Sequence, residues 1–319
     1  MNRSNPYDGY VVGRLPDSEW WDFGGHLYGL EPLTLPMDAL QDADDVTGGA
    51  AMHGAALESS RQRLLTGHAP GNIGAQESID SLEQVFWFRW IVGHQTTFIL
   101  WQLLARALSK RAVDADGREQ DLHRERCLVR GYSAMLLYAG SCPREVYHKV
   151  IRPSMARQHP AFSGAWARDY GNVRALLRGR ESVHGGDAAV ALLRECRLNR
   201  HIHEGIAAKL VPSAPSLLQS TAGHGMVGQL STLRVLYDAY FMTLRAQVPY
   251  DLVVLQLFRR LHAIRQDLAA QTLYVPMTPS EAEKPQALWR PDVVACERSM
   301  PEILGDIATA ALEPMIRTA

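Results

Sequence analysis

Apolar residues recur at helical spacing along most of the chain, whereas the alternation typical of a β-strand is nowhere sustained. Glycine and proline lie between the helical segments, for example at Gly185, Gly186 and Pro249, where they are typical of helix ends. No repeat of fixed period is visible. The pattern therefore predicts an all-α fold, with helices over residues 81–110, 119–140, 143–158, 162–180, 187–211, 226–246, 249–273 and 299–315.

The first 80 residues have a different character from the rest. Residues 1–40 are rich in proline, glycine and aromatic residues, which favours an extended arm that packs onto another surface. Residues 41–80 carry small and acidic residues, with only a short helical pattern over 55–65, and we expect them to be mobile. The predicted organisation is an N-terminal arm and mobile loop over 1–80, followed by a helical catalytic domain over 81–319.

Charge and composition narrow the class of partner. The 33 Lys and Arg residues balance 34 Asp and Glu residues, so no overall field attracts nucleic acid or an anionic membrane. A small molecule is the partner that this balance favours. The four cysteines show no paired spacing, and the first residues lack the pattern of a signal peptide. We therefore expect reduced thiols and a cytoplasmic protein.

The most apolar stretch, residues 85–108, is long enough to span a bilayer, but it contains Arg89, His94 and Gln102. Polar residues at such positions cost a few kcal/mol each in lipid, so a buried core helix fits the stretch better. Helical geometry places His94 on the face that also carries Trp87, Trp90, Ile91, Phe98 and Trp101. His94 is then either a core histidine with a structural role or a functional group inside an aromatic pocket.

A second histidine pair, His201 and His203, lies in the helix predicted over 187–211. Side chains two residues apart on a helix diverge by about 200°, so the two imidazoles do not bind one ion together. His203 shares its face with Leu192, Cys196 and other apolar residues, whereas His201 shares its face with charged residues. We therefore expect His203 to be buried and His201 to lie at a rim, with one functional histidine at most.

Two further segments carry candidate substrate-binding groups. Arg168 and Arg174 occur among small and apolar residues, and arginine forms bidentate pairs with carboxylates. Either arginine is equally well explained as a surface residue. Residues 220–228 match a glycine-rich nucleotide motif formally, but no strand precedes them, so a flexible loop with the hydroxyls of Ser220 and Thr221 is the better interpretation.

Taken together, these segments resemble the tryptophan 2,3-dioxygenase superfamily of haem enzymes. The aromatic helix with His94 and Gln95 is similar to the helix that supplies the distal histidine of that superfamily. Arg200 and His203, followed by Ile206 and Lys209, resemble its proximal ligand motif. The resemblance implies the tryptophan 2,3-dioxygenase-like helical fold with an extended N-terminal arm. It also implies that His203 is the axial ligand of the haem iron, with His201 as the alternative.

The N-terminal arm points to one branch of the superfamily. Residues 28–36, beginning at Tyr28, resemble the signature of the haem-dependent L-tyrosine hydroxylases of antibiotic biosynthesis. A relative with covalently attached haem carries a cysteine four residues after its ligand histidine, a position that Ala207 fills here. The resemblance therefore implies non-covalent haem b.

This branch implies an oxidoreductase that uses hydrogen peroxide to convert L-tyrosine to 3,4-dihydroxy-L-phenylalanine. His94 would act as general acid and base, and the substrate would contact Tyr28, Arg168 or Arg174, and Ser220 and Thr221. The aromatic arm suggests a homo-oligomer. Two other interpretations stay open: a tryptophan or indole oxygenase of the same superfamily, and a helical haem-binding protein without catalytic activity.

Overall fold

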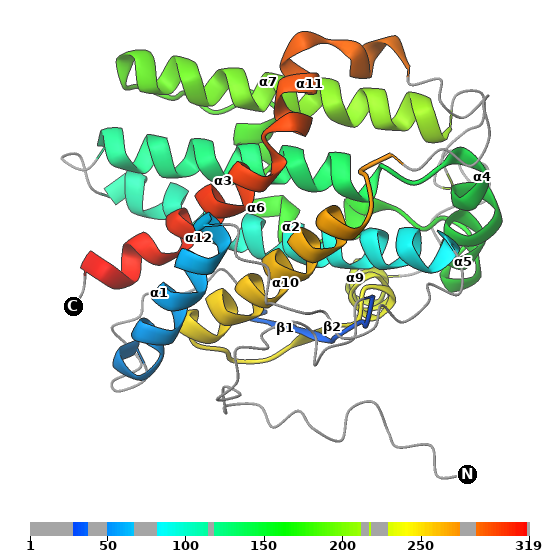
Figure 1. The fold of residues 1–319 in the computed structure, drawn as a ribbon, viewed down its shortest axis with the longest axis horizontal. Helices are drawn as coiled ribbons and strands as arrows, with labels where there is room; N and C mark the ends of the chain where they lie inside the picture. Colours follow the sequence, from blue (N-terminus) through cyan, green and yellow to red (C-terminus); the bar gives the residue numbers. More distant parts are fainter. Residues whose placement is uncertain are drawn as a thin grey trace.

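The computed structural model describes residues 28–37, 50–66, 82–113, 118–211, 217, 229–274 and 285–317. Helices make up most of this part of the chain, which confirms the predicted all-α class (Figure 1). The only strands among the described residues are β1 (Leu33–Leu35) and β2 (Thr243–Arg245). The long helices are α2 (Leu82–Val113), α3 (Arg118–Ala139), α7 (Gly186–Leu210) and α10 (Tyr250–Ala270).

Three of these helices form successive layers, with α3 between α2 and α7 (Figure 1). Helices α1 (Ala50–Thr66), α10 and α12 (Met300–Arg317) pack against one another, and α12 also lies on α3. Shorter elements complete the fold: α4 (Arg144–Val146), the π-helix η3 (Tyr147–Ile151), α5 (Arg152–Gln158), η4 (Gly164–Trp166), α6 (Tyr170–Leu177), α9 (Leu230–Tyr240), η6 (Gln286–Trp289) and α11 (Pro291–Arg298).

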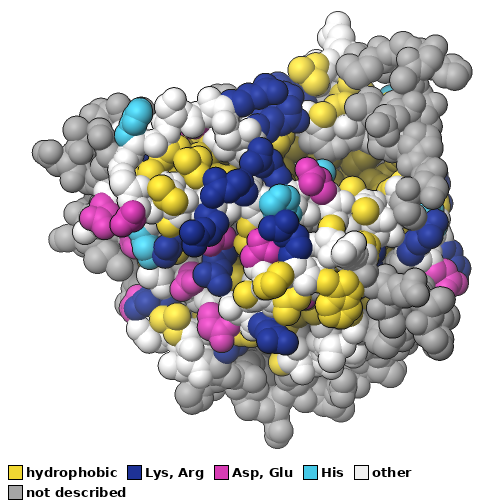
Figure 2. All heavy atoms as spheres, turned by 90° about the horizontal axis from the view of Figure 1, so that it is seen from above, with side chains coloured by type: hydrophobic (Ala, Val, Ile, Leu, Met, Phe, Trp, Pro, Cys, Tyr) yellow, Lys and Arg dark blue, Asp and Glu magenta, His cyan; other side chains and the backbone are white. Residues whose placement is uncertain are grey.

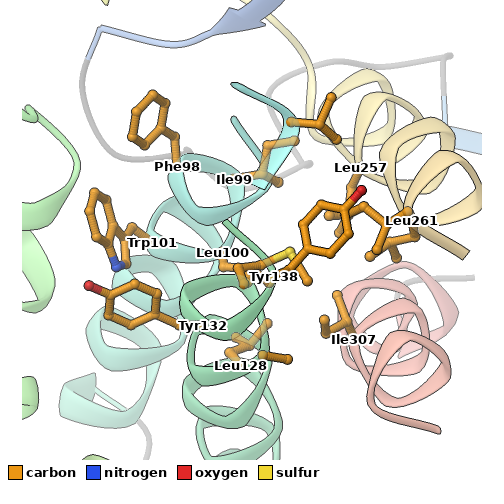
Figure 3. Close-up of a cluster of buried hydrophobic side chains, with 14 of the residues drawn as sticks. Phe98, Ile99, Leu100, Trp101, Leu128, Tyr132, Tyr138, Leu257, Leu261 and Ile307 are labelled. Carbon is orange, nitrogen blue, oxygen red and sulfur yellow. The ribbon is translucent and has the colours of Figure 1, made fainter. Parts of the chain in front are cut away.

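Helix α2 contains the apolar stretch over 85–108 and is buried nearly all round, as expected of a central core helix. Figure 3 shows that α2 and α3 separate two kinds of packing. Phe98, Trp101 and Tyr132 lie together on one side, and aliphatic residues of α10 and α12 lie on the other. No helix in the described part of the chain is apolar over a length that would cross a membrane.

The arm over residues 28–37 packs onto the helical body, as its composition predicts. β1 pairs in parallel with β2, with Leu33 opposite Thr243, and the side chains of Leu33 and Leu35 are fully buried. Gln256 of α10 holds the backbone of Thr34 from both sides, through bonds of 2.7 Å to its nitrogen and 2.9 Å to its oxygen. The arm is therefore an integral part of the core.

The short helical pattern over 55–65 is confirmed, since residues 50–66 form α1, whereas the mobility of residues 41–80 stays a prediction. Leu57, Ser60 and Leu64 on this helix are buried, and the helix packs against α12 and α10. The apolar contacts to two distant helices stabilise a segment whose own apolar pattern is short. The boundary of the catalytic domain at residue 81 stays a prediction.

A buried ion pair joins α2 to α10. The Arg89 Nε donates to Asp267 Oδ2 at 2.7 Å, and neither side chain is exposed to solvent. The hydroxyl of Tyr138 donates to the same carboxylate oxygen at 2.8 Å, and Arg89 also donates to the Leu273 carbonyl at 2.7 Å. The charges are thus paired and hydrogen-bonded, which is the condition for burying them.

Replacing Asp267 with asparagine should lower the free energy of unfolding by about 3–5 kcal/mol, because the Arg89 charge would stay buried without its counterion. The exposed pair of Arg290 and Asp292 offers a matched control. There the change Asp292→Asn should cost about 1 kcal/mol or less. Urea unfolding followed by circular dichroism measures both, and equal losses would contradict the structural role of the buried pair.

His262 of α10 faces α1, where its Nε2 lies 2.8 Å from the buried hydroxyl of Ser60. Burial, with the nearby charge of Arg63, lowers the pKa of His262 to about 4. The folded protein thus favours the neutral ring, so this contribution to stability is complete above about pH 6.5 and is lost as the pH falls through 4. The variant His262→Gln should therefore show a weaker loss of thermal stability between pH 6.5 and 4 than the wild type, and identical pH profiles would contradict the assignment.

Candidate functional site

His94 lies in an aromatic pocket at the middle of α2, as its sequence position predicts. Its ring stacks on Phe241 with centroids 4.5 Å apart, and the Trp90 ring lies 4.2 Å away. Phe98 completes the pocket at 6.4 Å. Burial lowers the pKa of His94 to about 4, so the imidazole is neutral at pH 7.

The hydrogen bond of His94 fixes its tautomer. Its Nδ1 lies 2.6 Å from the backbone oxygen of Trp90, and a carbonyl oxygen only accepts, so Nδ1 carries the proton and donates. The Nε2 atom therefore carries a lone pair, and it bonds to no described residue. A neutral imidazole with a free basic nitrogen in an apolar pocket is suited to accept a proton from a bound molecule.

Gln95 holds the surroundings of His94 in place. Its side-chain nitrogen donates to the backbone oxygens of Phe241 at 2.9 Å and Glu31 at 3.0 Å. Its oxygen accepts from Arg260 Nε at 3.0 Å. One buried amide thus joins α2, α10, the N-terminal arm and the residue that stacks on His94.

The last turn of α3 brings α2 and α7 to the same place. A β-carbon at Gly93, next to His94, would lie 3.0 Å from that of Ala139, so α2 and α3 are in close contact here. A β-carbon at Gly140 would lie 2.5 Å from Ile206, which is three residues beyond His203 on α7. The helix positions of His94 and His203 therefore lie near the same end of α3, on the helices at its two sides.

The prediction that His203 is buried is wrong. It falls between Leu192, Cys196 and Leu210 on the helical wheel, all of them buried, yet its own side chain is exposed. Surrounding protein nevertheless desolvates part of the imidazole and lowers its pKa. Helical periodicity gives the direction in which a side chain points, but it does not show whether another part of the chain covers that side of the helix.

His201 is more buried than His203, which reverses the expected order. Its Nδ1 is buried and has no hydrogen-bond partner among the described residues. It shares a side of α7 with Gly205, whose backbone packs against Leu288 of η6. His201 therefore faces the outer layer of the fold, and His203 is the histidine on the α3 side.

Two exposed neighbours of His203 on α7 determine what can approach its side chain. Ala207, one turn further along α7, is exposed and small, so a flat group could approach the histidine closely. Arg200, one turn before it, is exposed as well. Figure 2 shows the molecule from above the view of Figure 1, the side on which α7 lies, where Lys and Arg side chains form a band beside exposed hydrophobic ones.

The π-helix η3 reaches both histidine-bearing helices. The Tyr147 ring packs on Trp90 with centroids 6.0 Å apart, next to His94. The adjacent His148 donates from Nε2 to the backbone oxygen of Leu210 at 2.9 Å, at the end of α7. Lys209 donates to the three backbone oxygens that follow α3, including Gly140 at 2.9 Å. The ends of α3 and α7 are thus held together beside the site.

An ionic cluster surrounds Asp238 of α9. Arg245 of β2 pairs with Asp238 at 2.7 Å and with Asp169 at 2.9 Å, and Arg168 donates from Nε to Asp238 Oδ2 at 3.1 Å. The side chain of Arg168 is 18% exposed, whereas those of the two aspartates and Arg245 are 2–7% exposed. Arg168 is therefore the member of the cluster that solvent or a ligand reaches.

The other predicted contact residues do not join this group. Arg174 is exposed on α6. Tyr28 is buried with its ring edge-on to Phe88, 5.3 Å away, and burial and the charge of Asp267 raise its pKa. Phe88 and His94 point about 120° apart on α2, so we leave Tyr28 out of the site. Ser220 and Thr221 lie outside the described residues.

Comparison with known proteins bears on the half of the chain that carries His94. Residues 38–195 match the SfmD 3-methyl-L-tyrosine peroxygenase family. The match confirms the predicted family resemblance over these residues. The 3-methyl-L-tyrosine peroxygenase of Streptomyces lavendulae is 28% identical over 165 residues. The alignment covers 46% of this chain and 45% of the curated relative, so the match spans less than half of either protein.

The matched range ends eight residues before His203. The role of α7 thus depends on the geometry described above and on the sequence motif. The four cysteines are free and buried, as predicted for reduced thiols. Burial raises the pKa of Cys127 to about 11, so the thiol stays protonated at neutral pH.

Proposed function

We propose that this protein is a haem-dependent peroxygenase that hydroxylates L-tyrosine next to the phenol. L-Tyrosine and hydrogen peroxide would give 3,4-dihydroxy-L-phenylalanine and water, so the atoms and electrons balance without a separate reductant. The observation that carries the proposal is the neutral His94, held by the Trp90 carbonyl among aromatic rings, within a segment that matches a family of tyrosine-derivative peroxygenases.

The residues of α7 fit a non-covalent haem b. His203 is exposed and its pKa is lowered by desolvation, which favours the neutral imidazole, the form that binds iron. The small, exposed Ala207 would leave room for the group, and the exposed Arg200 would be available to pair with one of its carboxylates. Haem, when bound, supplies the redox-active iron that reacts with peroxide. His203 alone would hold this group on the protein side, so the site would not require a cluster of ligating side chains.

His94 would move the proton. Its Nε2 would take the proton from one oxygen of hydrogen peroxide and give it to the other oxygen, which leaves as water, while the first oxygen goes to the ring carbon of the substrate. The bond from Nδ1 to the Trp90 carbonyl keeps Nε2 basic and also stabilises the imidazolium that forms in between. The rings of Trp90, Phe98 and Phe241 exclude water and offer aromatic surfaces on which the phenol ring can pack.

Arg168 would bind the α-carboxylate of the substrate. Its two terminal nitrogens form no bond to described residues, and a guanidinium binds a carboxylate in a bidentate manner. Arg174, the other sequence candidate, lies on the exposed face of α6 and is not supported. Ser220 and Thr221 stay proposed contacts on the sequence pattern alone, as do the homo-oligomer and the cytoplasmic location.

The matched family is named for 3-methyl-L-tyrosine, which is therefore the second candidate substrate. The test is to load the protein with haem and to titrate it with L-tyrosine, 3-methyl-L-tyrosine and L-tryptophan while recording the Soret band. The proposal expects a spectral shift with L-tyrosine at lower concentration than with the other two. Tightest binding of 3-methyl-L-tyrosine would assign the second substrate, and tightest binding of tryptophan would support an indole oxygenase. Failure to take up haem would overturn the proposal.

A further inference from the structure

The ionic cluster beside the aromatic pocket contains two arginines that are bonded in different ways. Arg245 uses all three side-chain nitrogens, which donate to Asp169, Asp238 and the backbone oxygen of Pro36. Arg168 uses only Nε, which donates to Asp238. Arg245 therefore stabilises the cluster with all its donors, whereas the two terminal nitrogens of Arg168 can still donate to a ligand.

Asp238 is shared between the two arginines. Its Oδ1 accepts from Arg245 Nη2 at 2.7 Å, and its Oδ2 accepts from the Nε atoms of both arginines at 3.1 Å. Asp169 on the far side of Arg245 is in turn held by Gln102 of α2 at 2.6 Å. The cluster thus contains two positive and two negative charges, and Asp238 is nearly buried within it.

Helix α9 connects this cluster to His94. Tyr237, next to Asp238, packs on Phe241 with ring centroids 5.0 Å apart, and Phe241 stacks on the His94 ring. Residues three and four apart on a helix are neighbours, so one end of α9 places an aromatic ring on His94 and a carboxylate on Arg168. An aromatic amino acid has the same arrangement of an aromatic ring at one end and a charge at the other.

We propose that Asp238 is a positioning residue that sets specificity for the α-carboxylate of the substrate. It holds the Arg168 guanidinium through Nε, so that the edge formed by the two terminal nitrogens is presented to the ligand. Pre-organisation of this kind lowers the entropy lost when the carboxylate binds. The inference rests on the proposed function, because it requires an aromatic amino acid to bind beside His94.

Calorimetric titration of the haem-loaded protein with L-tyrosine and with tyramine, which lacks the carboxylate, tests this role without requiring turnover. In Asp238→Ala the Kd for L-tyrosine should rise about tenfold or more, because a charge-assisted contact is lost, while the Kd for tyramine should stay within about twofold. Asp238→Asn keeps the volume and serves if the alanine variant does not fold. Asp238→Glu, which restores the carboxylate, should recover part of the loss.

A double-mutant cycle distinguishes positioning from general support of the fold. If Asp238 acts through Arg168, adding Asp238→Ala to Arg168→Met should not weaken L-tyrosine binding further. Arg178→Met, on the exposed end of α6, is the matched control and should change neither Kd. Equal losses for both ligands, or none, would overturn this inference alone. A wild-type protein that binds neither ligand would overturn the proposed function together with it.

Discussion

Protein in which His203 is replaced by alanine is expected to lose its Soret band, because the haem iron would have no protein ligand. The loss of a group that merely supports a metal ligand costs about 10- to 100-fold in affinity, so loss of the ligand itself should cost more. The alanine substitution shortens a side chain that is already exposed, so the fold should stay intact. Haem titration of the apoprotein measures the affinity, and circular dichroism checks the helices.

The matched control for this prediction is His201→Ala, two residues away on the same helix. That variant should keep the Soret band, since His201 faces η6 rather than α3. Added imidazole should restore part of the spectrum of His203→Ala, because it can occupy the space of the missing ring. If His201→Ala loses the band while His203→Ala keeps it, His201 is the ligand and the assignment is wrong.

The change His94→Phe should lower kcat by about 10²- to 10⁴-fold while the Kd for L-tyrosine changes little. Phenylalanine keeps the stacking on Phe241 but removes the basic Nε2. Single-turnover mixing with hydrogen peroxide measures the catalytic step, and the Soret shift measures binding. His123→Gln, an exposed histidine of α3, is the control and should leave both unchanged.

The pH dependence of the wild type gives an independent check on His94. Burial holds its pKa near 4, so the basic form persists well below the ordinary histidine range. We expect kcat/KM to stay level from pH 7 to about 5 and to fall only as the pH approaches 4. A fall centred near 6.5 that disappears in His94→Phe would contradict this protonation state.

Several helix ends that glycine or proline marks were predicted correctly, whereas the helix predicted over 162–180 is wrong, because only η4 and α6 form there. The segment predicted after Pro249 begins at Tyr250, and the segment predicted over 187–211 is α7 to within one residue. The predictions fail where contacts with residues distant in the sequence determine the secondary structure. Residues 226–246 were expected to be one helix, but the chain leaves α9 at Phe241 and pairs as β2 with an arm some 210 residues away. Local periodicity contains no information on such a pairing.

The two histidines show the same limit at the site. The aromatic environment of His94 could be predicted, because its neighbours are on its own helix at helical spacing. The exposure of His203 could not be predicted, since it depends on which distant elements cover that side of α7. The cluster around Asp238 was also missed: its members come from α2, α9, β2 and the segment before α6, and no sequence motif joins them.

The most direct test of the central claim is the origin of the oxygen atom in the product. Haem-loaded protein is mixed with L-tyrosine and ¹⁸O-labelled hydrogen peroxide without dioxygen, and the product is analysed by mass spectrometry. The account predicts 3,4-dihydroxy-L-phenylalanine with one ¹⁸O atom and none of this product with His94→Phe on the same timescale. Absence of hydroxylated product, or a product formed only when dioxygen and a reductant are supplied, would contradict it.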